Sequence, residues 1–134
     1  MGARKRLAAD KKKESKAITA IASLRNCPVS ARKMRLVAGL VRGKEVNIAL
    51  SILAHHPKEA AARLEKLLKS AISSWEQKNT DRSIENEKLI VREVKVDHAG
   101  MLKRIRPSPQ GRANRIRKRS NHTTLIVDSV KTEA

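Results

Sequence analysis

The stretch KRIRPSPQGRANRIRKR, residues 103–119, contains eight Lys or Arg and no acid. Pro107, Pro109 and Gly111 interrupt it near its middle, and segments rich in Val and Ile flank it on both sides. This density of cations without acids is not typical of a solvated helix face, and the central Pro and Gly are typical of a turn between strands. The stretch therefore predicts a cationic β-hairpin arm whose ligand is a polyanion.

The net charge of +18 is concentrated in two segments. Residues 1–16 hold seven Lys or Arg against two acids, and residues 100–119 hold eight against none. A free compact protein with this charge would repel itself, so the composition indicates a partner that supplies negative charge. Nucleic acid is the leading candidate, and an anionic membrane surface is the second.

Several classes of protein are disfavoured. The longest apolar run, Ala17 to Leu24, is interrupted by Thr19 and Ser23 and is far shorter than the ~20 residues of a membrane-spanning helix. Trp75 is the sole aromatic residue, which excludes modules that stack RNA bases on several exposed rings. The lone Cys27 can form no internal disulfide, as is usual in the cytoplasm.

Residues with catalytic or metal-binding chemistry do not form a recognisable pattern. His55 and His56 have no carboxylate or thiol at ligand spacing, and the sequence contains no Gly-rich phosphate loop and no nucleophile with a matching base. We therefore expect no enzyme activity, no cofactor and no metal site.

A length of 134 residues favours one domain. Residues 1–16 carry almost no bulky apolar side chains, which predicts a flexible basic N-terminal tail that either orders on nucleic acid or acts as a disordered solubilising segment. Residues 17–134 are predicted to form a single globular α+β domain that includes the hairpin arm, about residues 98–122.

Helical periodicity predicts three helices. The first follows Ser30, a good N-cap, and stops at Gly43; the second spans about residues 45–54. The third has Pro57 in its first turn, stops near Asn79, and carries one broad apolar stripe. Two pairs at i, i+4 support this third helix, namely Glu59 with Arg63 and Glu65 with Lys69.

Alternation of apolar and polar residues predicts strands at about 18–27, 88–98 and 122–130, with a polar loop at 79–87. Helices early in the chain and a hairpin late in it indicate an α+β fold, with three helices packed on one face of a small antiparallel sheet.

If residues 98–122 continue the last two strands, the arm has legs of about ten residues and reaches ~30 Å from the domain at ~3.3 Å per residue. An isolated hairpin without an apolar face is marginal in water, so surrounding molecules must order the arm. A solvated loop or a localisation tag is disfavoured, because strands frame the run. His98 and His122 flank the arm and could face each other across the hairpin.

Several motifs together form a pattern that is known from one protein family. They are Ser30-Ala31-Arg32-Lys33-Met34-Arg35-Leu36-Val37-Ala38, Val41-Arg42-Gly43-Lys44, Ala49-Leu50 with Ile52-Leu53, Lys103-Arg104-Ile105 with Pro107, Gly111-Arg112-Ala113, Ile116, Lys118-Arg119 and His122. These motifs closely resemble the family of bacterial ribosomal protein twenty-two of the large subunit. The resemblance covers residues 17–130.

The resemblance implies a structural constituent of the large subunit, in the cytoplasmic ribosome, that binds large-subunit rRNA and supports assembly. Its hairpin would line the nascent-peptide exit tunnel, where the tip meets the fourth large-subunit protein and the passing nascent peptide. The implied rRNA-binding residues are Lys33, Arg35, Arg42, Lys44, Lys103, Arg104, Arg112, Arg115, Arg117, Lys118, Arg119 and His122. The implied tunnel-lining tip consists of Arg106, Pro107, Ser108, Pro109, Gln110, Gly111 and Arg112.

The sequence departs from the family pattern in two places. Ser108-Pro109-Gln110 replaces a commonly more basic segment at the tip, and the first sixteen residues are not expected in the family. A second hypothesis comes from another class: a DNA-bending architectural protein whose basic β-arm inserts Pro107 or Pro109 into the minor groove.

Overall fold

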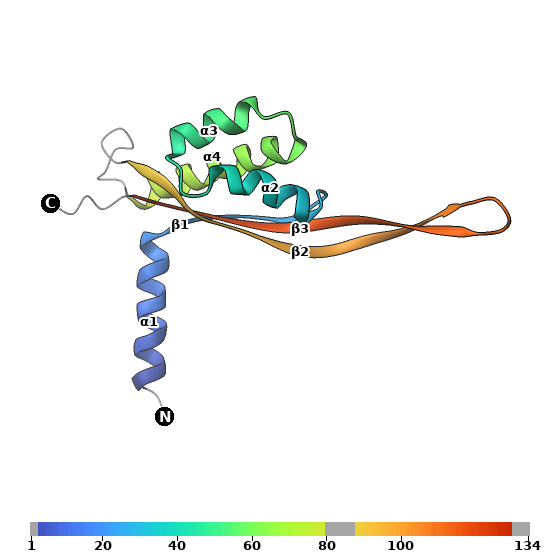
Figure 1. Cartoon of the computed structure of the whole chain (residues 1–134). Coiled ribbons are helices and arrows are strands. Elements are labelled where there is room, and N and C mark those ends of the chain that lie inside the picture. The colour runs from blue at the N-terminus through green and yellow to red at the C-terminus, as the bar shows by residue number, and fades with distance from the viewer. Residues whose placement is uncertain (1–2, 80–87, 130–134) are drawn as a thin grey trace.

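The computed structural model describes residues 3–79 and 88–129, and these form an α+β fold, as the sequence predicts (Figure 1). The elements follow the chain in the order α1 (Ala3–Ile18), β1 (Ala20–Cys27), α2 (Ala31–Val41), α3 (Val46–His55), α4 (Glu59–Lys78), β2 (Leu89–Pro107) and β3 (Ala113–Ser129). The predicted loop at 79–87, apart from Asn79, and the end of the last predicted strand at Val130 lie outside the described residues.

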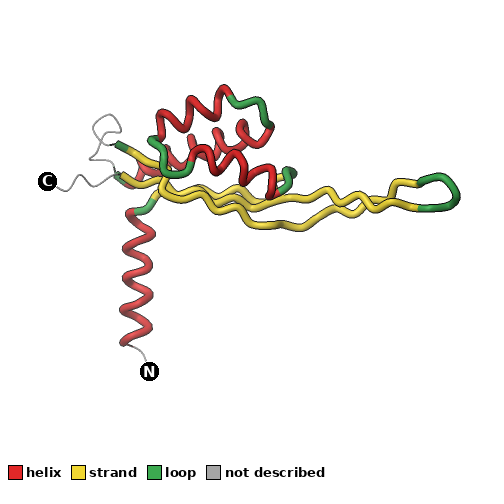
Figure 2. The backbone as a smooth tube through the Cα atoms, viewed as in Figure 1, coloured by secondary structure: helices red, strands yellow, loops and turns green. Residues whose placement is uncertain are grey.

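The three strands form an antiparallel sheet in the order β1-β3-β2, so the last strand of the chain is the central one. Helices α2, α3 and α4 cover one face of this sheet, and β2 and β3 continue well past them as a two-stranded arm (Figures 1 and 2). The helices thus cover the part of the sheet whose apolar side chains are buried, and they leave the arm uncovered.

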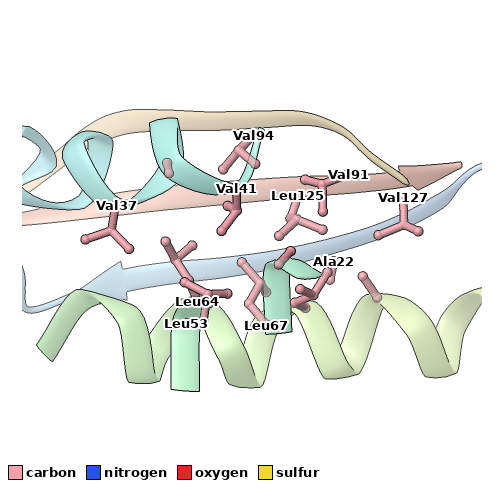
Figure 3. Packing of buried hydrophobic residues seen from close by; sticks show 14 of the residues in the cluster. Ala22, Val37, Val41, Leu53, Leu64, Leu67, Val91, Val94, Leu125 and Val127 are labelled. Atoms are coloured by element: carbon pink, nitrogen blue, oxygen red, sulfur yellow. The ribbon is translucent and has the colours of Figure 1, made fainter. Parts of the chain in front are cut away.

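The hydrophobic core fills the layer between the helices and the sheet. Figure 3 shows Leu125 and Val127 of the central strand in this layer with Val37 and Leu64 of the helices. Every second residue of β3 is buried from Asn121 to Val127, which is the period of a strand covered on one face. At ~25 cal/mol per Å² of buried apolar area, this layer is the main source of stability for the domain.

The three predicted helices are confirmed as α2, α3 and α4. Asn79 caps the C-terminus of α4 as predicted. Both predicted ion pairs form: Arg63 contacts Glu59 at 2.9 Å, and Lys69 contacts Glu65 at 2.7 Å. Ser30 occupies the N-cap position of α2, although its side chain makes no capping hydrogen bond.

The prediction that Pro57 lies in the first turn of a helix is wrong. Helix α4 begins at Glu59, and the backbone is extended at His56 and at Lys58. The proline ring disfavours helical backbone in the residue before it, which accounts for the extended His56. Pro57 therefore belongs to the link between α3 and α4.

Residues 3–18 are helical, whereas the sequence predicted a flexible tail for residues 1–16. The segment is composed mainly of Ala, Leu, Lys, Arg and Glu, which have high helix propensity, and it contains no Gly or Pro. Helix α1 points away from the sheet on the side opposite α2, α3 and α4 (Figure 1). The prediction considered burial alone and neglected this local propensity.

Candidate nucleic-acid interface

Both legs of the arm are regular strands from Met101 to Pro107 and from Ala113 to Arg119. The continuation of the strands through the basic segment is therefore confirmed. The register places most cations opposite an uncharged residue, as in the pairs Met101↔Arg119, Leu102↔Lys118, Arg104↔Ile116, Ile105↔Arg115 and Arg106↔Asn114. Long cationic stems can lie along these aliphatic neighbours while their charged ends reach outward.

One pair in the arm joins two cations, Lys103 and Arg117. Like charges directly opposite each other on a sheet are destabilising, and no acid lies in residues 103–119 to offset them. A phosphate between the two side chains would turn this repulsion into attraction.

The face of β3 that is buried in the domain becomes cationic on the arm. Asn121, Thr123 and Leu125 point toward the helices, and the same alternation places Arg119, Arg117 and Arg115 on the continuation of that face. These three arginines are exposed, because α2 and its neighbours end before the arm begins. A surface that would be core within the domain is thus open to an anionic partner.

Paired bulges mark the boundary between the domain and the arm. In β1, Arg25 and Asn26 oppose one residue of β3, and in β2 Ala99 and Gly100 oppose Ser120. The Ser120 hydroxyl donates a hydrogen bond to the Gly100 carbonyl. Such bulges increase strand twist locally, so they set the direction in which the arm leaves the sheet.

The turn at the end of the arm is compact and closed by two hydrogen bonds. The Ser108 amide donates to the Arg112 carbonyl at 2.8 Å, and Asn114 Nδ2 donates to Ser108 Oγ at 2.6 Å. Gln110 and Gly111 have φ of 63° and 69°, in the left-handed region that favours glycine. The predicted tip, Arg106 to Arg112, therefore corresponds to the end of β2 and this turn.

A groove of about 480 Å³ lies where the arm leaves the domain. Lys33 lines it from α2, and Arg117, Lys118 and Arg119 line it from β3. These predicted rRNA-binding residues are more than eighty positions apart in sequence, and the fold brings them to one concave surface. The groove combines four cations with no acid among its lining residues.

A second groove, of about 760 Å³, lies between α2 and the outer edge of β2. Arg35 and Arg42 line it from α2, and Arg92 and Lys95 line it from the strand. Arg92 and Lys95 are not among the residues predicted from the sequence, and both are ion-paired: Arg92 contacts Asp128 at 2.8 Å, and Lys95 contacts Glu93 at 3.2 Å. Lys44 lies outside this groove, in the turn that pairs with Val91.

Arg35 and Arg42 have a structural role that the sequence did not reveal. Arg35 donates from Nε and one terminal nitrogen to the Val96 carbonyl at 3.1 and 2.8 Å, and Arg42 donates to the Val94 carbonyl at 2.9 Å. Strand β2 is an edge strand, so these carbonyls have no strand partner on that side. The two arginines therefore fasten α2 to the sheet and cover its exposed edge.

His122 is held by the domain. Its Nδ1 accepts a hydrogen bond of 3.1 Å from the Asn26 backbone N–H, which the bulge in β1 has withdrawn from regular pairing. His98 pairs with Asn121 and His122 with Asp97, so the predicted facing of the two histidines is wrong. The bulge residues Ala99 and Gly100 shift the register on the arm side of this pair. With Nδ1 accepting, the ring proton resides on Nε2.

The described residues contain no cluster of three or more His, Cys, Asp or Glu side chains that could hold a metal ion. Cys27 is buried in the core. Among the helices of the described part of the chain, none combines the length and the apolar character needed to cross a membrane.

The family model described as ribosomal protein L22p/L17e matches residues 22–128. The chain belongs to this family. The match includes the sheet, the helices α2 to α4 and the whole arm, and it excludes α1.

Relatives named "Large ribosomal subunit protein uL22" resemble nearly the whole chain. The protein of Flavobacterium johnsoniae is 57% identical over 130 residues, covering 97% of this chain and 95% of its own length. That of Bacteroides fragilis is 58% identical over 129 residues, covering 96% and 94%. That of Porphyromonas gingivalis is 53% identical over 133 residues, covering 99% and 98%. These matches extend beyond the family model into the segment that forms α1.

Arg35→Ala should destabilise the isolated domain, because it leaves the Val96 carbonyl without its donor; the expected loss is ~1–2 kcal/mol of unfolding free energy. Lys33→Ala, which removes an exposed cation two positions away, is the matched control and should change stability by less than ~0.5 kcal/mol. Urea unfolding of the two variants measures both. Equal stability of the Arg35 variant and the parent protein would contradict a fastening role.

Proposed function

We propose that this protein is a structural constituent of the large ribosomal subunit that binds large-subunit rRNA and supports assembly. The observation that carries the proposal is the arm: seven exposed cations on two paired strands and Arg112 in the turn between them, in a chain of a ribosomal protein family. The role is non-enzymatic. Family membership also disfavours the alternative of a DNA-bending protein.

The interface that we propose has two parts. The groove at the base of the arm, with Lys33, Arg117, Lys118 and Arg119, would hold an RNA backbone against the domain. Along the arm, Lys103, Arg104, Arg112 and Arg115 would contact phosphates on both sides of the hairpin. Exposed Leu102, at 59% of its surface, and Ile105, at 72%, would lie against sugars and base edges in the same contact.

Arg35, Arg42, Lys44 and His122 would contribute at the margin of this interface. Arg35 and Arg42 already bond to backbone carbonyls, but each guanidinium has five N–H groups and can also donate to a phosphate. Lys44 is exposed beside them, and His122 retains its Nε2 proton as a donor. Their RNA contacts would therefore be combined with structural contacts.

We further propose that the tip lines the nascent-peptide exit tunnel and contacts the fourth large-subunit protein. Two features support this placement. The tip is the part of the arm farthest from the domain, and Ser108, Pro109, Gln110 and Gly111 carry no charge, unlike the legs. A surface without charge would let a nascent peptide pass without binding it, whereas the basic legs would bind rRNA.

Replacing Lys103, Arg104, Arg112 and Arg119 together with Ala should weaken association with large-subunit rRNA and slow subunit assembly. Four lost phosphate contacts reduce the slope of log K against log salt by roughly three. Filter binding across a salt series measures the slope, and sucrose-gradient sedimentation measures incorporation. Thermal unfolding should be unchanged, because the arm contributes no residue to the core. Unaltered binding and incorporation would refute the proposed interface.

Replacing the uncharged residues Ser108–Gly111 with a two-residue Asn-Gly turn, with Arg112 kept, should spare incorporation into large subunits but alter the passage of nascent peptides, because the cations that anchor the arm are all retained. Gradient sedimentation checks the first expectation. Cross-linking from a photoreactive nascent peptide to the tip, present in the parent protein and lost in the variant, checks the second. Failure of the variant to enter subunits would show that the tip is itself an anchor.

A further inference from the structure

Helix α1 is strongly cationic and is not part of the domain. From Ala3 to Lys13 it has six Lys or Arg and one acid, and all of its cations there are exposed. Within the described part of the chain, α1 makes no extensive packing contact with the sheet or with α2 to α4, and the family model that matches the domain does not include it (Figure 1). The function proposed above therefore leaves α1 without a role.

The cations of α1 are arranged in two triplets, Arg4-Lys5-Arg6 and Lys11-Lys12-Lys13. Within a triplet, successive residues are rotated by ~100°, so three of them span ~200° of the helix surface. Each residue of the second triplet follows its counterpart in the first by seven positions, so the second triplet lies about two turns, ~10 Å, along the axis and over almost the same arc. The two triplets thus form one wide cationic surface that runs along the helix.

The rest of the helix surface differs in chemistry. Ala3, Leu7 and Asp10 follow at i, i+4 and i+7 on the narrow stripe that the triplets leave free. Ala8 and Ala9 fall on the cationic surface between the triplets, where their small side chains let a ligand approach the helix backbone. The one acid of this segment therefore faces away from the surface that an anion would contact.

An isolated helix of this length is marginal in water, and α1 has no broad apolar stripe that could pack on a protein. Leu7 is its one bulky apolar residue before the last turns and is 60% exposed. A cationic surface that spans ~200° of the helix is wider than one RNA backbone can contact. Two backbones, one on each side of the helix, would contact the whole of it.

The position of α1 also separates it from the arm. Helix α1 leads into Ala20, which pairs with Val127 of β3. Val127 is fourteen residues along β3 from Ala113, where the strand begins at the tip of the arm. At ~3.3 Å per residue this is ~45 Å. The two most basic segments of the chain therefore lie at opposite ends of the sheet (Figure 1).

We propose that α1 is a second RNA-binding element, seated between two RNA backbones with its Ala3-Leu7-Asp10 stripe turned outward. This inference rests on the proposed function, in which the protein is assembled into the large subunit. Helix α1 and the arm are attached to the same sheet, so binding of RNA by one of them raises the effective concentration of RNA at the other. Helix α1 would thus join an RNA segment near the start of β1 to the RNA that surrounds the arm.

The test places a short photoreactive cross-linker on a single introduced cysteine in assembled large subunits. Ala9→Cys lies on the cationic surface and Leu7→Cys on the opposite stripe, and the native Cys27 is buried. RNA cross-linking should be severalfold higher from position 9 than from position 7. Adding Ala8→Pro, which breaks the helix but keeps every charge, should make the two yields converge.

A charge-matched pair of variants provides a second readout. Replacing Arg4, Lys5 and Arg6 with Gln should lower the salt slope of subunit retention by about two to three. Replacing three cations elsewhere, Lys58 at the N-cap of α4 with Lys66 and Lys69 within it, by Gln should leave the slope unchanged. Equal slopes for both variants, equal cross-linking from positions 7 and 9, or cross-links to protein in place of RNA would overturn the inference. A protein that never enters subunits would instead refute the proposed function.

Discussion

The pairing of β2 with β3 is the constraint on which the rest of the structure depends. The same two strands build the core at one end and the arm at the other. At the core end, Val91, Val94, Leu125 and Val127 are buried under the helices, and this burial fixes the register. The register then extends into a segment where nothing apolar is buried and where Lys103 lies opposite Arg117. The domain can set the geometry of the arm, but it cannot neutralise its charge.

The outer edge of β2 also combines a structural role with a cationic surface. Strand β2 exposes carbonyls that could pair with another chain, and Arg35 and Arg42 occupy them, while the backbone of Gly43 and Lys44 pairs with Val91. Covering the edge with arginines discourages association between copies and leaves cations at the rim of a groove. Under the proposed function, some of the same side chains would therefore supply both stability to the free domain and affinity for an anion.

Local patterns predicted much of this fold. Apolar spacing located α2, α3 and α4, and alternation located the three strands, because each of these elements has one buried face. Contacts between distant segments could not be predicted in this way. The central place of β3, the hydrogen bonds from Arg35 to Val96 and from Asn26 to His122, and the meeting of Lys33 with Arg119 all depend on packing that a local pattern does not encode. For α1 the local signal was present in its Ala- and Lys-rich sequence, but the absence of an apolar stripe concealed it.

The central claim is that the arm is ordered by RNA and the domain by its own core. Amide hydrogen exchange of the free protein and of the protein in the large subunit tests it most directly. The account predicts that residues 101–107 and 113–119 exchange rapidly in the free protein and are strongly protected in the subunit, while Val91 to Val96 and Thr123 to Val127 are protected in both. Strong protection of the arm in the free protein would contradict it.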